Sequence, residues 1–168
     1  MAYQRKKDPN VTALAPYYRL RDKKVAVLEP AGGSPWAVFV RRHLLTSGAE
    51  IVSGKPSDLK APDLDGLLLL DGGGDAEFTD EGSQGLIREM AGAGKVLGGV
   101  GASAVSLVKA DSSLQKKKWT TSKERSQSET LAGYTGKVVE ADGKLVTTTG
   151  FDKTALRAFL SAFKSAID

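Results

Sequence analysis

The chain has 168 residues, 40% of them hydrophobic and 26% charged, a balance typical of one soluble globular domain. It has no cysteine and a single histidine, His43, which excludes disulfides, thiol nucleophiles, thiolate metal sites and multi-histidine metal sites. We therefore expect neither a metal nor a cofactor. No apolar run approaches the roughly 18 residues that span a bilayer, and residues 1–24 lack the apolar middle of a secretory signal. These features predict a soluble intracellular protein, in the cytosol or in an organelle matrix.

Positive charge is concentrated near the N-terminus. Residues 1–24 carry seven basic and two acidic side chains, a net of +5, so the remaining 144 residues carry −1 of the overall +4. A second basic run, Lys116–Lys118, precedes Trp119. Such runs are most often solvated surface, but they can also bind an acidic partner or nucleic acid.

Residues 1–22 are predicted to form a basic extended arm, separate from an α/β domain over residues 23–168. The arm has neither a helical nor a strand period and contains two prolines, so it would be disordered on its own. Tyr17, Tyr18 and Leu20 could pack on the domain, whereas the first dozen residues are expected to lie on another protein. The candidate partner-binding residues are Arg5, Lys6, Lys7, Tyr17, Tyr18, Arg19, Arg21, Lys116, Lys117 and Lys118.

The domain begins with a βαβ pattern. Val25–Leu28 is a short continuous apolar run, which predicts a strand buried on both faces. After a glycine-rich turn, Ser34 is predicted to cap a helix that has Pro35 in its first position and Gly48 at its end. Ala49–Val52 is predicted as the second strand. The inward face of the helix is expected to be Trp36, Phe39, Val40, His43 and Leu44.

Strands and helices continue to alternate through the rest of the chain. Strands are predicted at Leu67–Leu70 and Val96–Val100, with a helix between them that Thr79 or Asp80 caps. A sharp corner at Gly101 and Ala102 leads into the next helix. The remaining elements are a hairpin, Lys137–Glu140 and Lys144–Thr149 with its turn at Asp142 and Gly143, and a final amphipathic helix from about Leu156 to Ile167. This order predicts a three-layer α/β sandwich with a mostly parallel sheet.

Three segments together resemble the ThiJ/PfpI family of the class I glutamine amidotransferase-like superfamily. They are Asp65–Gly74 (DGLLLLDGGG), Gly94–Leu107 (GKVLGGVGASAVSL) and Val138–Gly150 (VVEADGKLVTTTG). The resemblance implies a flavodoxin-like fold over Lys24 to the C-terminus. It also implies that a cysteine belongs at the elbow between strand and helix, where the helix N-terminus stabilises its thiolate.

The chain departs from the family at each chemical position. The elbow residue is Gly101, followed by Ala102 and Ser103. The family's glutamate falls near Pro35 or Trp36, with Glu29 the one acid close by, and Ser122 and Lys123 follow Thr120 and Thr121 where a histidine is common. Trp36 is expected to fill the former pocket, Ser103 to cap the helix, and Gly72, Gly73 and Gly74 to form a structural turn, although such a loop can bind anions. A strand pair that relatives carry between Val52 and Asp65 is missing, which puts the family's homodimer in doubt.

These departures predict a non-catalytic family member that serves as a structural or regulatory subunit of a larger assembly, held in part by its arm. Two alternatives remain open. One is an enzyme of altered chemistry, such as a hydrolase, lyase or glyoxalase, that uses Ser103 or a water activated by Glu29. The other is an RNA- or ribosome-associated subunit that binds phosphates through its basic runs.

Overall fold

The computed structural model describes residues 19–72, 78–122, 132–150 and 152–168. Its centre is one six-stranded sheet in the order β2-β1-β3-β4-β6-β5. The strands are β1 (Lys24–Leu28), β2 (Glu50–Val52), β3 (Gly66–Leu69), β4 (Val96–Val100), β5 (Val139–Asp142) and β6 (Leu145–Thr148). All neighbouring pairs are parallel except β5 and β6, which form a hairpin. The predicted three-layer, mostly parallel α/β fold is confirmed.

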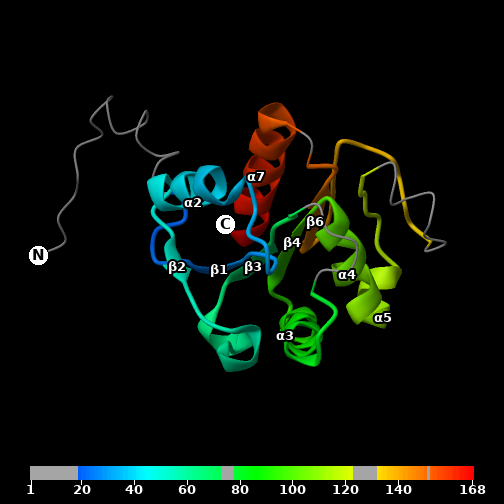
Figure 1. Cartoon of the computed structure of the whole chain (residues 1–168), viewed down its shortest axis with the longest axis horizontal. Helices are drawn as coiled ribbons and strands as arrows, with labels where there is room; N and C mark the ends of the chain where they lie inside the picture. The colour runs from blue at the N-terminus through cyan, green and yellow to red at the C-terminus, as the bar shows by residue number, and fades with distance from the viewer. Residues whose placement is uncertain (1–18, 73–77, 123–131, 151) are drawn as a thin grey trace, which may run out of the picture.

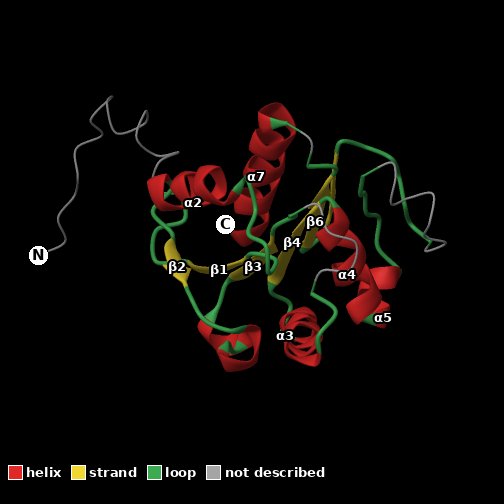
Figure 2. Cartoon of the chain, viewed as in Figure 1, coloured by secondary structure: helices red, strands yellow, loops and turns green. Residues whose placement is uncertain are grey.

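Helices cover both faces of the sheet (Figures 1 and 2). One face carries α2 (Ala37–Thr46) and α7 (Lys153–Ile167). The other carries α3 (Glu81–Gly92), α4 (Ala102–Ala110) and the short α5 (Ser112–Gln115). Within the described ranges, no helix has the length and apolar character to cross a membrane.

Each face of the sheet has its own apolar core. On the α2–α7 side, alternate strand residues such as Val25 and Val27 pack with Leu44, Phe159 and Phe163. On the α3–α4 side, the intervening residues, Ala26 and Leu28 among them, pack with Ile87, Met90 and Leu107. The strands are apolar on both faces because both faces are covered, which explains their continuous apolar runs.

Two glycines in β4 let the helices approach the sheet closely. A Cβ on Gly98 would lie 2.8 Å from Cδ2 of Phe163, on α7. A Cβ on Gly99 would lie 2.7 Å from Cδ1 of Leu107 and 2.9 Å from Cα of Ala104, both on α4. Side chains at these positions would therefore push both helical layers away from the central strand.

The start of α2 differs from the prediction. The helix begins at Ala37, not at Pro35, so the assignment of Ser34 as its N-cap is wrong. The N–H of Ala37 donates to the carbonyl of Ser34, and this preceding turn delays the helix by two residues. The Ser34 hydroxyl instead donates to the carbonyl oxygen of Asp71 at 2.6 Å, which connects two loops.

The segment between β2 and β3 contains two 3-10 turns, Pro56–Asp58 and Ala61–Asp63. Residues 53–65 form no strand, as the short spacing predicted. At the start of the described chain, Leu20 is fully buried in the α2–α7 core, and its N–H donates to Ser47 O at 2.8 Å. Leu20 is thus part of the folded body, although it lies within the predicted arm.

Candidate functional site

The strand-to-helix corner after β4 is built on a glycine. Gly101 has φ of 57° and ψ of −126°, a conformation that residues with a side chain rarely adopt. Its N–H donates to Thr148 O at 2.8 Å, and its carbonyl accepts a hydrogen bond from the Thr121 hydroxyl at 2.7 Å. The corner is therefore buried and fixed from both sides, as the predicted elbow requires.

The space that a side chain on residue 101 would need is occupied by Asp71. A Cβ placed on Gly101 would overlap with Oδ2 of Asp71, and its next neighbours would also be Asp71 atoms. The same oxygen accepts a long hydrogen bond, 3.5 Å, from the N–H of Ala102, the first residue of α4. A carboxylate there complements the partial positive charge of the helix N-terminus. The family resemblance implies a cysteine thiolate at this helix N-terminus. In this chain the carboxylate of Asp71 supplies the negative charge there instead.

Sequence reasoning quoted Asp71 within the glycine-rich motif but did not select it as a site residue. The available signal was an acidic residue directly after the buried strand β3, next to β4 in the sheet. Because parallel strands end at the same edge, the residues that follow β3 and β4 lie close together.

Ser103 is fully buried in the first turn of α4. Its hydroxyl donates to the carbonyl oxygen of Leu70 at 2.7 Å, so the prediction that it caps the helix is wrong. That carbonyl belongs to the residue directly after β3 and accepts the hydrogen bond of the hydroxyl. His43, the single histidine, is on α2 on the opposite face of the sheet from α4. The structure does not bring a serine and a histidine together at the elbow.

Three residues were considered for the position of the family's glutamate, and their environments differ. They are Glu29, Pro35 and Trp36. Glu29 follows β1 and forms an ion pair with Arg41 at 3.3 Å. Pro35 is exposed, and the half-buried Trp36 packs against the α2–α7 core. Trp36 was expected to fill the former pocket, but the volume next to Gly101 is filled by Asp71 instead.

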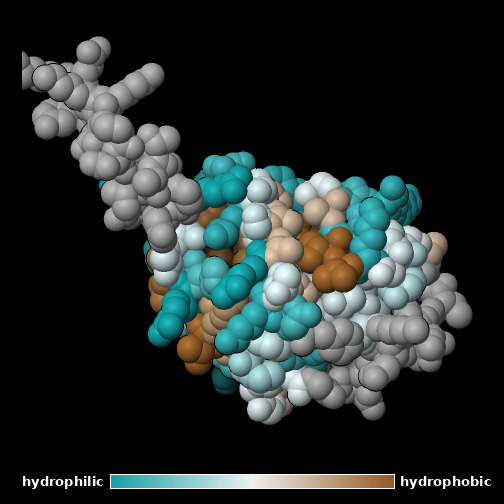
Figure 3. Space-filling view, turned by 90° about the horizontal axis from the view of Figure 1, so that it is seen from above, coloured by the Kyte–Doolittle hydropathy of each residue, from teal (hydrophilic) through white to brown (hydrophobic). Residues whose placement is uncertain are grey.

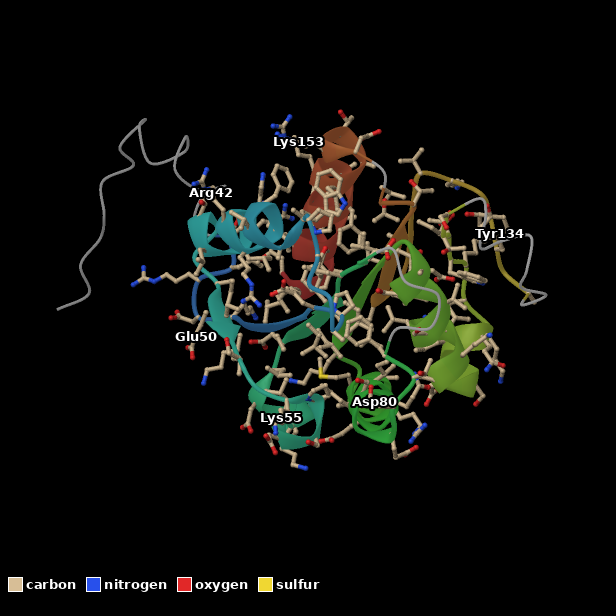
Figure 4. All side chains as sticks on the ribbon, in the orientation of Figure 1. Arg42, Glu50, Lys55, Asp80, Tyr134 and Lys153 are labelled. Carbon is tan, nitrogen blue, oxygen red and sulfur yellow. The ribbon has the colours of Figure 1, made fainter. Side chains whose placement is uncertain are left out.

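An open cavity of about 840 Å³ lies at the carboxyl ends of β1, β2 and β3. Its charged lining comprises Glu29, Arg41, Lys55 and Asp80, and Gly72 also contributes. Figure 4 shows Lys55 and Asp80 on the side of the sheet away from Arg42 and Lys153. None of the described elbow residues, 101–103, lines this cavity. Of the predicted glycine-rich loop, Gly73 and Gly74 lie outside the described residues.

The predicted basic residues do not form one patch. Arg19 pairs with Asp168 at 2.9 Å, and Arg21 is exposed nearby in sequence. Lys116–Lys118 follow α5, at the opposite end of the sheet (Figure 1). Of this run, Lys116 and Lys118 are exposed. Arg5, Lys6, Lys7, Tyr17 and Tyr18 lie outside the described residues.

No protein-family model matches the sequence, and no curated protein matches it significantly. Solved structures are similar in fold. A two-domain protein from Anabaena variabilis, with DJ-1/ThiJ/PfpI-like and ferritin-like domains, has a TM-score of 0.72 at 21% identity. The match covers 85% of this chain and 47% of that protein, so the chain spans about half the relative's length.

Two further structures extend over nearly whole chains. A ThiJ/PfpI domain protein from Brachyspira murdochii has a TM-score of 0.70 at 17% identity, covering 88% of this chain and 96% of its own. A DJ-1 superfamily protein from Salmonella typhimurium, solved as a cysteine-to-alanine variant, has a TM-score of 0.68 at 19% identity, covering 85% and 89%. This protein therefore has the fold of the DJ-1/ThiJ/PfpI superfamily, with a glycine at the elbow and no cysteine anywhere in the chain.

Proposed function

We propose that this protein is a non-catalytic member of the DJ-1/ThiJ/PfpI fold that serves as a structural or regulatory subunit of a larger protein assembly. The observation that carries the proposal is the position of Asp71, whose carboxylate occupies the volume of the missing elbow side chain. The elbow is thus not a vacant site that awaits a substitute nucleophile. It is filled by a carboxylate that stabilises the N-terminus of α4.

The surroundings of the elbow support the same proposal. The Ser103 hydroxyl donates a hydrogen bond to Leu70 O, and the residue has no exposed surface. It is therefore poorly placed to attack a substrate. The Thr121 hydroxyl is buried and likewise donates, to Gly101 O. These hydroxyls hold the corner together, a structural role that needs no substrate.

The subunit role predicts the native mass of the protein in gently lysed cells that produce it. The chain has a mass of 17.7 kDa. We expect it to sediment with an assembly several times heavier than two chains, and to remain there after RNase treatment. Sedimentation as a monomer or as a homodimer, with no other protein at constant ratio, would contradict the proposal.

A second candidate, an enzyme of altered chemistry, is favoured by the cavity at the carboxyl ends of β1–β3. Ligands of doubly wound α/β proteins commonly bind at this edge of the sheet. There Glu29 could activate a water, although its carboxylate already forms an ion pair with Arg41. The test is turnover of α-oxoaldehydes and amides by the wild-type protein, Glu29→Gln and Ser103→Ala. Turnover that Glu29→Gln abolishes would establish this candidate, and no turnover above the blank would remove it.

A further inference from the structure

The two helices on one face of the sheet carry cations without acidic residues. Within its bounds, α2 contains Arg41, Arg42 and His43, and α7 contains Lys153, Arg157 and Lys164. Neither helix contains an aspartate or glutamate. On the opposite face, α3 mixes Glu81 and Glu89 with Arg88. On that face α4 carries the single cation Lys109, so the helices of the α2–α7 face have more cations and no carboxylate within their bounds.

Contacts across the junction of α2 and α7 hold these cations in place. The Arg157 guanidinium lies 5.9 Å from the centroid of the Phe39 ring, within the range of a cation–π contact. The rings of Phe39 and His43 are 4.6 Å apart. Nζ of Lys164 donates to the Ser47 hydroxyl at 3.1 Å. Basic groups from both helices thus face one shared surface.

Three carboxylates near the two helices are already engaged. Asp168 pairs with Arg19, and Glu29 pairs with Arg41. Asp152 accepts a hydrogen bond from Ala155 N as the cap of α7. In the described part of the chain, no ion pair involves Arg42, Lys153, Arg157 or Lys164.

The pKa shifts of His43 and Lys164 agree with the presence of several cations at the junction of α2 and α7. Burial lowers the pKa of His43, and the charges of Lys164 and Arg157 lower it further. Burial also lowers the pKa of Lys164, with a smaller effect from Arg19. Beside the larger effect of burial, both shifts have a smaller cause in neighbouring cations, which shows that like charges lie close together at the junction.

Exposed aliphatic side chains lie beside the cations. Val38 is 75% exposed and Leu45 is 58% exposed, and with Arg42 they occupy positions i, i+4 and i+7 of α2, which share one helical face. Figure 4 shows Arg42 and Lys153 pointing away from the sheet on the same side. Figure 3 views the molecule from that side and shows apolar patches between hydrophilic side chains. We name Val38, Arg42, Leu45, Lys153 and Arg157 the α2–α7 surface.

We propose that the α2–α7 surface binds an acidic segment of a different protein, one that also presents apolar side chains. This inference rests on the proposed subunit role and specifies the surface that would serve it. Carboxylates of the partner would pair with Arg42, Lys153 and Arg157, and its apolar residues would cover Val38 and Leu45. Arginine is well suited to such contacts because its guanidinium binds carboxylates in a bidentate manner.

Two other occupants fit the surface less well. A second copy of this chain, related by a two-fold axis through the surface, would place the same cations against one another. Single-stranded RNA is usually held by exposed aromatic rings that stack on bases. Here the exposed apolar groups are aliphatic, and the Phe39 ring is already in contact with Arg157 and His43.

The test compares two full-length variants with equal changes in net charge. Arg42→Glu/Arg157→Glu reverses two charges on the α2–α7 surface, and Lys60→Glu/Lys109→Glu reverses two on the opposite, α3–α4 side of the sheet. All four side chains belong to exposed residues, so both variants should fold, which thermal unfolding verifies. Each is expressed in place of the wild-type chain, and its share in the native assembly is measured by sedimentation.

We expect the share of Arg42→Glu/Arg157→Glu in the assembly to fall about tenfold, because lost attraction and new repulsion combine. Lys60→Glu/Lys109→Glu should stay within about twofold of wild type. If the wild-type protein sediments in an assembly and both variants remain in it, the surface is wrong but the subunit role stands. If the wild-type protein sediments alone, the proposed function itself fails.

The chemistry of the partner is tested separately with a photoreactive residue in place of Leu45. The expected product is a cross-link to a segment of another protein that contains several Asp or Glu residues beside apolar ones. A cross-link to a second copy of this chain, to RNA or to a segment without acidic residues overturns the inference.

Discussion

At residue 101 both the backbone conformation and the neighbouring carboxylate require a glycine. Gly101→Ala would place a Cβ at φ of 57° and against Asp71. We expect a loss of about 2–4 kcal/mol in the free energy of unfolding, from backbone strain and overpacking together. Chemical denaturation of the purified variant measures this loss.

A double-mutant cycle separates the two causes. Asp71→Ala removes the overlapping carboxylate but leaves the strained φ, so Gly101→Ala should cost less in that background, by about 0.5–3 kcal/mol. Strict additivity of the two substitutions would mean that Asp71 does not occupy the elbow volume. Gly85→Ala provides the matched control, since a Cβ there has no atom within 4 Å.

His43 makes the stability of the protein depend on pH. Its pKa in the folded protein is below the ordinary value of 6.5 because of burial, Lys164 and Arg157. The unfolded chain therefore binds a proton more readily, so this residue's stabilising contribution is complete above pH 6.5 and is lost as pH falls through the folded pKa. The described charged groups that act on His43 are the cations Arg157 and Lys164, and Arg19, which acts on Lys164, is already paired with Asp168.

Replacement of this histidine should reduce the pH dependence. Between about pH 7.5 and about pH 5.5, the free energy of unfolding of His43→Gln should fall less than that of wild type. Urea denaturation at both pH values measures the difference. Equal slopes for the two proteins would show that His43 does not lose its proton preferentially on folding.

At the scale of elements, the glycines of β4 determine how closely the helices pack on the sheet. Gly98→Ala and Gly99→Ala should each lower the free energy of unfolding by about 1–3 kcal/mol, since the new methyl meets Phe163 or the α4 backbone. The larger loss is expected at Gly99, because the Cα of Ala104 cannot rotate away as a flexible side chain could. Gly85→Ala in α3 should instead be neutral or stabilising by up to about 1 kcal/mol. Thermal or urea unfolding of all three variants distinguishes these outcomes.

Most elements were predictable because their signals are local. The continuous apolar run at Val25–Leu28 indicated a buried strand. Thr79 and Asp80 were the two candidates for the cap of α3, and the cap is Asp80, which accepts a hydrogen bond from Ser83 N. The hairpin was also predicted, although its first strand begins at Val139, two residues later than expected. Boundaries near loops were less predictable. The Ser34 hydroxyl, for example, donates a hydrogen bond to the carbonyl of Asp71, which lies far away in sequence.

At the scale of the whole molecule, the candidate site was only partly predictable. The glycine at the elbow was visible in the sequence, but the group that replaces the side chain was not. Ser34, Asp71 and Gly101 come from three loops that meet only when β1, β3 and β4 align in the sheet. The same holds for Arg157 and Phe39, whose contact depends on how α2 and α7 pack together.

The elbow and the α2–α7 surface differ in character. The elbow is filled and fixed by internal hydrogen bonds, whereas the α2–α7 surface exposes cations and aliphatic side chains. If the chain is non-catalytic, as we propose, we expect it to interact with its partner through this surface. The proposal that Asp71 is a structural replacement, and not a new catalytic group, connects these two observations.

The most direct measurement is steady-state turnover by the purified wild-type protein and by Asp71→Asn, a change that keeps the shape of the side chain but removes its charge. The panel should include α-oxoaldehydes, amides and esters, with the heat-unfolded protein as the blank. We predict that neither protein exceeds the blank on any substrate. Wild-type turnover that Asp71→Asn abolishes would show that the elbow carboxylate is catalytic, and would contradict the account.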